Sequence, residues 1–207
     1  MVNEVRIYAE GGGGGKDTKA AIRRGFGEFL RQLRTLARER RIRWKIIACG
    51  PRNAAFDAFK TALRTHTTAF NVLLVDAEGA VNQTPWGHLH ERDGWNHPHV
   101  ADDHCHLMVQ MMEAWFVADI DILESFYGNG FRRGAIPARD EVEAIDKAVL
   151  ETALQNATRD SRKGPYHKIR HGSKLLCLID SQIVRPKAPH CERLFTTLAH
   201  KIEAEEE

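Results

Sequence analysis

The chain has 207 residues, of which 43% are hydrophobic and 28% are charged, and its formal net charge at pH 7 is +2. These values are ordinary for one folded domain with a buried core, and they exclude a strongly charged overall field as the basis of function. The sequence has no apolar run of the roughly 20 residues that a membrane span needs. Its four cysteines lie far apart, without a C-x-x-C pair. We therefore expect a cytoplasmic protein with reduced thiols and no membrane partner.

Apolar runs at 5–9, 44–50 and 72–75 indicate strands, and the last has the pattern of a strand buried on both faces. Segments at about 17–40 and 53–66 lie between these runs, and their apolar residues recur at helical spacing. The alternation of strand and helix predicts an α/β fold with a mostly parallel sheet flanked by helices.

The rest of the chain is expected to be mainly helical. Residues 1–125 would form the α/β core, and residues 126–207 would form a helical extension packed on it. Helices are predicted at four further places: 107–123, 140–156, from near His167, and from about His190.

Acidic side chains follow the first and third of the predicted strands. Glu10 ends the first strand, and Asp76-Ala77-Glu78 follows the third. In open α/β sheets, ligands collect beyond the carboxyl ends of the strands, and carboxylate oxygens suit a hard divalent cation. We therefore predict that Glu10, Asp76 and Glu78 converge on such a cation, although a solvated turn uses the same residue types.

Five glycines, Gly11 to Gly15, follow Glu10 and precede Lys16. Such a run predicts a flexible loop whose backbone can approach a ligand closely. It is not a nucleotide-binding P-loop, because that template requires glycine where Glu10 stands and serine or threonine where Asp17 stands.

Residues 80–103 have no hydrophobic period and are predicted to form a long His-rich loop, with a hairpin inside it as an alternative. A zinc site there is conceivable, but the H-P-H and H-C-H spacings lack the gaps typical of structural zinc sites. Ordinary surface or hydrogen-bonding histidines are favoured. The histidines concerned are His88, His90, His97, His99, His104 and His106.

The predicted helix at 107–123 carries an unusual polar stripe: His106, Gln110 and Glu113 recur at helical spacing among methionines and aromatics. A carboxylate buried in such surroundings needs a partner. Glu113 is therefore a metal ligand, a group that supports a ligand, or the partner of an arginine.

Basic residues cluster in two places. Arginines cover the outer face of the segment 17–43, where a solvated face and a phosphate-binding surface both remain open. A second cluster lies at 159–174, and four of its members are candidate phosphate contacts, with a solvated basic loop as the alternative. These four are Lys163, Arg170, His171 and Lys174.

On these motifs the chain resembles a Toprim domain, the metal-dependent fold of topoisomerases, primases and OLD-type nucleases. The resemblance rests on Ala9-Glu10-Gly11 and Asp76-Ala77-Glu78. Residues 111–119 and 168–176 are similar to a domain-of-unknown-function family of small OLD-like proteins, a likeness that covers nearly the whole chain.

The resemblance implies a Toprim-like sheet and a role for each acidic residue. Glu10 would be a metal ligand or general acid/base, and Asp76 and Glu78 would ligate Mg²⁺ or Mn²⁺. Glu78 stands where such domains usually have a second aspartate. Glu113 would be an auxiliary ligand and Lys168 the cation that stabilises the transition state. An AAA- or ABC-type ATPase partner in anti-phage defence is implied as well.

The chemistry that fits these expectations is hydrolysis of phosphodiesters in DNA or RNA. The alternative is a non-catalytic Toprim-like scaffold that binds an ATPase partner or nucleic acid, and a zinc-dependent hydrolase is a third reading. The sequence leaves open whether the protein forms a homo-oligomer.

Overall fold

The computed structural model describes residues 2–204, and its sheet consists of four parallel strands in the order β2-β1-β3-β4. This arrangement confirms the predicted α/β fold with a parallel sheet. The strands are β1 (Glu4–Glu10), β2 (Arg43–Gly50), β3 (Phe70–Asp76) and β4 (Cys105–Met108).

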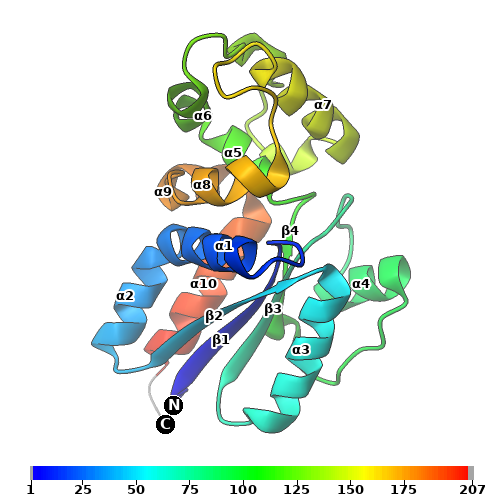
Figure 1. Cartoon of the computed structure of the whole chain (residues 1–207). Coiled ribbons are helices and arrows are strands. Elements are labelled where there is room, and N and C mark those ends of the chain that lie inside the picture. Colours follow the sequence, from blue (N-terminus) through cyan, green and yellow to red (C-terminus); the bar gives the residue numbers. More distant parts are fainter. Residues whose placement is uncertain (1, 205–207) are drawn as a thin grey trace.

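Helices cover both faces of the sheet, as Figure 1 shows. One face packs against α1, α2 and α10, and the other packs against α3 and α4. The bounds of these helices are α1 (Lys16–Phe29), α2 (Arg31–Glu39), α3 (Arg52–Thr65), α4 (Pro85–Asp93) and α10 (Pro189–Glu203).

A second group of helices lies beyond the carboxyl ends of the strands, above the sheet in Figure 1. We call this group the cap. A single π-helical turn, Lys168–Gly172, leads into its fourth helix. The cap helices are α5 (Glu113–Ala118), α6 (Ile120–Tyr127), α7 (Lys147–Thr158), α8 (Ser173–Leu176) and α9 (Ser181–Val184).

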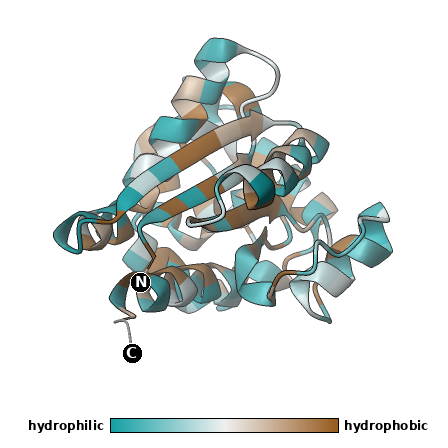
Figure 2. Cartoon of the chain, turned by 90° about the horizontal axis from the view of Figure 1, so that it is seen from below, coloured by the Kyte–Doolittle hydropathy of each residue, from teal (hydrophilic) through white to brown (hydrophobic). Residues whose placement is uncertain are grey.

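The central strand β3 is buried along its whole length, as its uninterrupted apolar run predicted. Its side chains alternate between the two faces of the sheet. Val72 and Leu74 belong to the cluster under α1 and α10, whereas Leu73 and Val75 belong to the cluster under α3 and α4. Figure 2 shows the result, with hydrophobic residues concentrated on the strands and hydrophilic residues on the surrounding helices.

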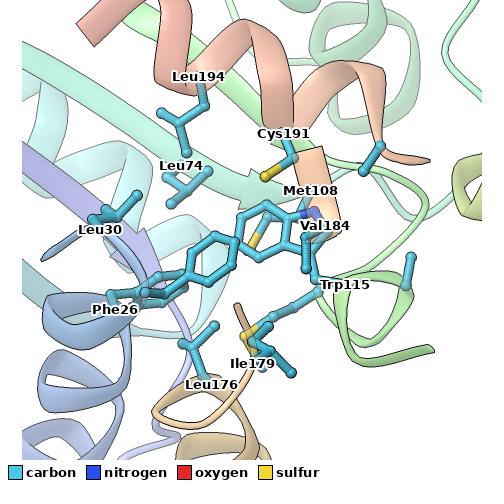
Figure 3. Close-up of a cluster of buried hydrophobic side chains, with 14 of the residues drawn as sticks. Phe26, Leu30, Leu74, Met108, Trp115, Leu176, Ile179, Val184, Cys191 and Leu194 are labelled. Carbon is cyan, nitrogen blue, oxygen red and sulfur yellow. The ribbon is translucent and has the colours of Figure 1, made fainter. Parts of the chain in front are cut away.

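The cap is joined to the core through Trp115 of α5, which is fully buried. Its ring stacks on Phe29 of α1 with a centroid separation of 4.8 Å. In Figure 3 the indole lies between side chains of α1, including Phe26, and side chains of α10, including Leu194. Residues before and after position 125 therefore share one hydrophobic cluster. The C-terminal helix α10 belongs to this cluster and covers the same face of the sheet as α1.

The prediction of a helix over 107–123 was wrong at its start. Cys105–Met108 is the edge strand β4, and helix begins only at Glu113. Met108, Met112 and Trp115 have helical spacing, but they reach one core cluster from a strand and a helix in succession. His106 therefore lies on a strand and does not share a helix face with Glu113.

Three other boundaries differ from prediction, and one is the helix expected over 140–156, which begins only at Lys147. The segment 17–40 forms two helices separated at Leu30, and residues 80–103 contain the helix α4. Thr84 caps α4 by accepting a hydrogen bond from Gly87 N at 3.3 Å, and the helix ends at Gly94 with φ of 66°. Both are ordinary helix-boundary signals. None of the helices within residues 2–204 is both long and apolar enough to span a bilayer.

Candidate metal centre

Glu10, Asp76 and Glu78 meet at the carboxyl end of the sheet, where each offers an oxygen within 4.8 Å of the others. The parallel pairing of β1 and β3 explains this meeting, because it brings the ends of both strands to one edge. Glu10 Oε2 accepts a hydrogen bond from Asp76 N at 3.1 Å. The predicted convergence of the three carboxylates is confirmed.

Asp76 is the most buried of the three, at 1% exposure. Its Oδ1 accepts a hydrogen bond from Met112 N at 2.8 Å, just before α5. Its Oδ2 lies 3.0 Å from Lys168 Nζ. The carboxylate is thus oriented by the main chain on one side and by a cation from the cap on the other.

Glu10 is held by a residue that sequence reasoning missed. Arg52 Nη1 lies 3.4 Å from Glu10 Oε2 and also donates to the Asp76 carbonyl oxygen at 2.7 Å. Its Nη2 donates to Asp93 Oδ2 at 2.8 Å. Burial and the Asp76 charge raise the pKa of Glu10 to about 7, against the opposing effect of Arg52.

Glu78 lies just past the strand in a left-handed backbone conformation, with φ of 67°. Its N–H donates to the Gln110 carbonyl oxygen at 2.6 Å. Its carboxylate forms ion pairs with Lys147 and, at 3.8 Å, with Arg92. Burial alone would raise the pKa of Glu78, but these two cations outweigh burial and lower it.

Glu113 lies behind this group and is 1% exposed. Its Oε1 accepts a hydrogen bond from the Tyr166 hydroxyl at 2.7 Å, and its Oε2 lies 3.7 Å from Lys168 Nζ. Burial raises the pKa of Glu113 despite the lysine. The cationic partner of Glu113 is thus Lys168 and not an arginine, which was one alternative that the sequence left open. Glu113 lies outside the three-carboxylate group, and direct metal ligation by Glu113 stays a prediction.

Lys168 links two buried carboxylates, Asp76 and Glu113, while about half of its own side chain remains exposed. Burial opposes its charge, but the two carboxylates outweigh burial and raise the pKa of the ammonium group. Lys168 is therefore charged at neutral pH and aimed at the carboxylate group.

The remaining basic candidates lie elsewhere. His171 is 5% exposed, and its Nδ1 accepts hydrogen bonds from the Tyr127 hydroxyl at 2.9 Å and from His167 N at 3.2 Å. This nitrogen is therefore not available to a phosphate, and a phosphate contact through Nε2 of His171 stays a prediction. Lys163 Nζ lies over the Phe126 ring, at 4.7 Å from its centroid. Phosphate contacts by Lys163 and two exposed residues stay predictions; these two are Arg170 and Lys174.

The histidines of the segment after β3 are engaged with main-chain groups. His88 Nε2 donates to the Ala77 carbonyl oxygen at 2.9 Å, and His104 Nδ1 donates to the Asn71 carbonyl oxygen at 2.6 Å. The expectation of hydrogen-bonding histidines is confirmed for these two. Within residues 2–204, the ligand-type side chains that gather in a group of three are the carboxylates of Glu10, Asp76 and Glu78.

A cavity of about 550 Å³ opens beside the carboxylates, and Glu10, Asp76 and Lys168 are part of its wall. Arg52 therefore does not close off Glu10 and Asp76 from this cavity. Oxygens that share Mg²⁺ are about 2.9 Å apart at neighbouring coordination positions and about 4.2 Å apart across the ion. The three oxygens, which lie within 4.8 Å of one another, must therefore draw together by side-chain rotation to share one ion. Three carboxylates could hold a metal ion here, and their oxygens suit a hard divalent cation.

Comparison with known proteins gives one match. Residues 9–199 fit the model of a family described as a domain of unknown function (DUF4276). The chain belongs to this family. No curated protein and no solved structure matches it. The DUF4276 region contains every residue of the site described above, from Glu10 of β1 to Lys168 of the cap. A place in a domain-of-unknown-function family, predicted from the sequence, is thereby confirmed.

Proposed function

We propose that this DUF4276 protein is a divalent-metal-dependent nuclease that hydrolyses phosphodiester bonds of DNA or RNA. The observation that carries the proposal is the meeting of Glu10, Asp76 and Glu78 within 4.8 Å at the carboxyl edge of a parallel sheet. Mg²⁺ or Mn²⁺ bound there would neutralise phosphate charge and activate water for attack.

The protein's own groups are arranged for this role. Main-chain N–H groups of Met112 and Asp76 orient the carboxylates of Asp76 and Glu10 toward the shared group. Lys168, with its ammonium group 3.0 Å from Asp76 Oδ2, would stabilise the negative charge that develops on the phosphate. Glu10 would act as metal ligand or proton acceptor, in keeping with the resemblance to Toprim domains.

A cleavage assay tests the proposal. The purified protein is incubated with Mg²⁺ or Mn²⁺ and single-stranded DNA, double-stranded DNA or transfer RNA. We expect metal-dependent cleavage that is lost in Asp76→Ala. The circular dichroism spectrum of this variant should match that of the folded wild type. Asp57→Ala removes an exposed carboxylate of α3 and serves as the matched control. Equal cleavage by wild type and Asp76→Ala would rule out the proposed active site.

One observation favours a second candidate, a non-catalytic scaffold. Each carboxylate already has a cationic partner in the protein: Arg52 for Glu10, Lys168 for Asp76 and Lys147 for Glu78. Such pairing balances charge without an ion. A scaffold of this kind would bind its partner but would show no carboxylate-dependent uptake of Mg²⁺ in a calorimetric titration.

The resemblance to OLD-type nucleases leads to a proposal about biological context. We infer that the protein acts with an AAA- or ABC-type ATPase in defence against phage. Addition of an ATPase encoded next to the gene for this protein is expected to raise the cleavage rate when ATP is present. Cleavage that does not respond to the ATPase, and no co-purification of the two proteins, would contradict this partnership.

A further inference from the structure

The cavity beside the carboxylates has a second, apolar part that metal and phosphate chemistry leaves unexplained. Besides Glu10, Asp76 and Lys168, its wall contains the glycine loop, which we define as Gly11–Gly13. Side chains of α1, β4, the start of α5 and residues 166–169 complete the wall. The apolar and aromatic members of the wall are Ile22, Met108, Met112, Tyr166 and Ile169.

A phosphodiester gains nothing from such a wall, because the phosphate is charged and strongly hydrated. The wall suits an apolar, flat group attached to the phosphate. At about 550 Å³ the cavity falls in the range of pockets that enclose a small molecule. We propose that it binds an unstacked nucleobase of a single-stranded nucleic acid whose phosphate lies at the carboxylates, an inference that rests on the proposed nuclease function.

Tyr166 provides an aromatic surface for the base. Its hydroxyl donates to Glu113 Oε1 at 2.7 Å, which fixes the ring at the cavity wall. Aromatic stacking is sequence-tolerant because every base has a π-face, and it strengthens binding by about tenfold or more per base. The tyrosine thereby couples the base site to Glu113, which lies next to Lys168.

The glycine loop packs closely on α1 and contributes backbone without side chains to the cavity wall. Gly12 has φ of +83°, and a Cβ there would lie 2.9 Å from the Cα of Lys19 and from Cγ2 of Ile22. A Cβ on Gly13 would lie 3.8 Å from Cδ1 of Ile169, so Gly13 and Ile169 face each other near the cavity rim. Bare backbone here lets a flat group approach closely.

This arrangement selects against duplex substrates. A base that is paired and stacked in a helix presents only its edges, so it must leave the stack to enter a pocket. Single strands, loops and frayed ends supply such a base at much lower cost. The cavity therefore favours single-stranded nucleic acid over a continuous duplex.

Binding experiments test the base site independently of cleavage. Adenosine monophosphate and ribose 5-phosphate are titrated calorimetrically into the protein with Mg²⁺. We expect the nucleotide to bind at least about tenfold more tightly than the sugar phosphate. Ile169→Gln places an amide at the rim in place of a half-exposed isoleucine and should reduce this ratio. Ile183→Gln makes the same change at an exposed position outside the cavity and should leave the ratio unchanged.

The outcomes separate this inference from the nuclease proposal. Equal affinity for the two ligands, binding of neither, or an equal loss in both glutamine variants would overturn the base site. If cleavage is observed, a single strand should be cut at least about tenfold faster than its duplex, and equal rates would also overturn the base site. A base-dependent affinity in a protein that cuts nothing would support the pocket while the nuclease proposal fails.

Discussion

Lys168 Nζ lies 3.0 Å from Asp76 Oδ2, a contact that joins the cap to the end of the central strand. The same ammonium group lies 3.7 Å from Glu113 Oε2. One cation thus serves two carboxylates that are almost fully buried, and Glu10 adds a third acidic group nearby. Three acidic groups therefore surround Lys168, while Arg52 balances part of the charge at one of them, Glu10.

Replacement of Lys168 separates metal binding from catalysis. In Lys168→Met the site loses a competing positive charge, so Mn²⁺ should bind at least as tightly as in wild type. The cleavage rate should fall by about a hundredfold to a thousandfold, because the phosphate loses the cation that stabilises its developing charge. Mn²⁺ titration and a cleavage time course measure the two effects. Lys60→Met, which removes a partly exposed lysine of α3 outside the cavity wall, is the control, and a loss of metal affinity in Lys168→Met would contradict the assigned role.

The Tyr166 hydroxyl is expected to hold Glu113 and, through it, Lys168. Tyr166→Phe leaves a buried carboxylate oxygen without its donor, which should lower the free energy of unfolding by about 1–3 kcal/mol. Cleavage should fall while Mn²⁺ affinity stays near that of wild type. Tyr127→Phe removes a different buried hydroxyl, the one bonded to His171, and should lower stability without an effect on cleavage. Equal effects of the two variants on cleavage would show that Tyr166 has only a structural role.

The sheet and its acidic edge were predictable because they depend on local patterns. The buried run at 72–75 and the carboxylates after it place Asp76 and Glu78 at a sheet edge, and parallel topology brings Glu10 to them. The strand β4 was not predictable in the same way. It has only four residues, its side chains are buried on both faces, and its last methionine continues the helical spacing of those that follow.

The cations around the site depend on tertiary structure, which the sequence pattern does not encode. Lys147 reaches Glu78 from α7, and Arg92 reaches it from α4. The sequence pattern predicts a loop where α4 lies. Arg52 left a usable signal, because it follows β2 directly and so lies at the same edge as Glu10. The basic run at 159–174 contains Lys168, which reaches the carboxylates, but the run alone could not distinguish exposed Arg170 from buried His171.

His106 provides a pH test of the fold away from the metal centre. It is fully buried, its Nε2 donates to the Asp103 carbonyl oxygen at 3.0 Å, and its Nδ1 accepts from Arg193 at 3.2 Å. Burial, aided by the Arg193 charge, lowers the pKa of His106 to about 3. The folded state therefore binds fewer protons than the unfolded state, whose histidine has a pKa of about 6.5, and stability should fall as the pH drops below that value.

Urea unfolding between pH 7 and pH 4.5 measures this effect. His106 alone should contribute a slope of up to about 1.4 kcal/mol per pH unit once the pH is below about 6. In His106→Gln the amide can replace both hydrogen bonds without titrating, so the variant should lose less stability on acidification. An identical pH dependence in the two proteins would contradict the assignment of a neutral, buried His106.

The most direct test of the metal centre is a calorimetric titration of Mn²⁺ into wild type and Asp76→Asn, with Asp57→Asn as a control for an exposed aspartate of α3. Asp76 offers a carboxylate to the shared group, so its loss should weaken Mn²⁺ binding by about tenfold or more, whereas the control should bind as wild type does. Equal Mn²⁺ affinity in wild type and a folded Asp76→Asn, or no binding to wild type, would contradict the metal centre.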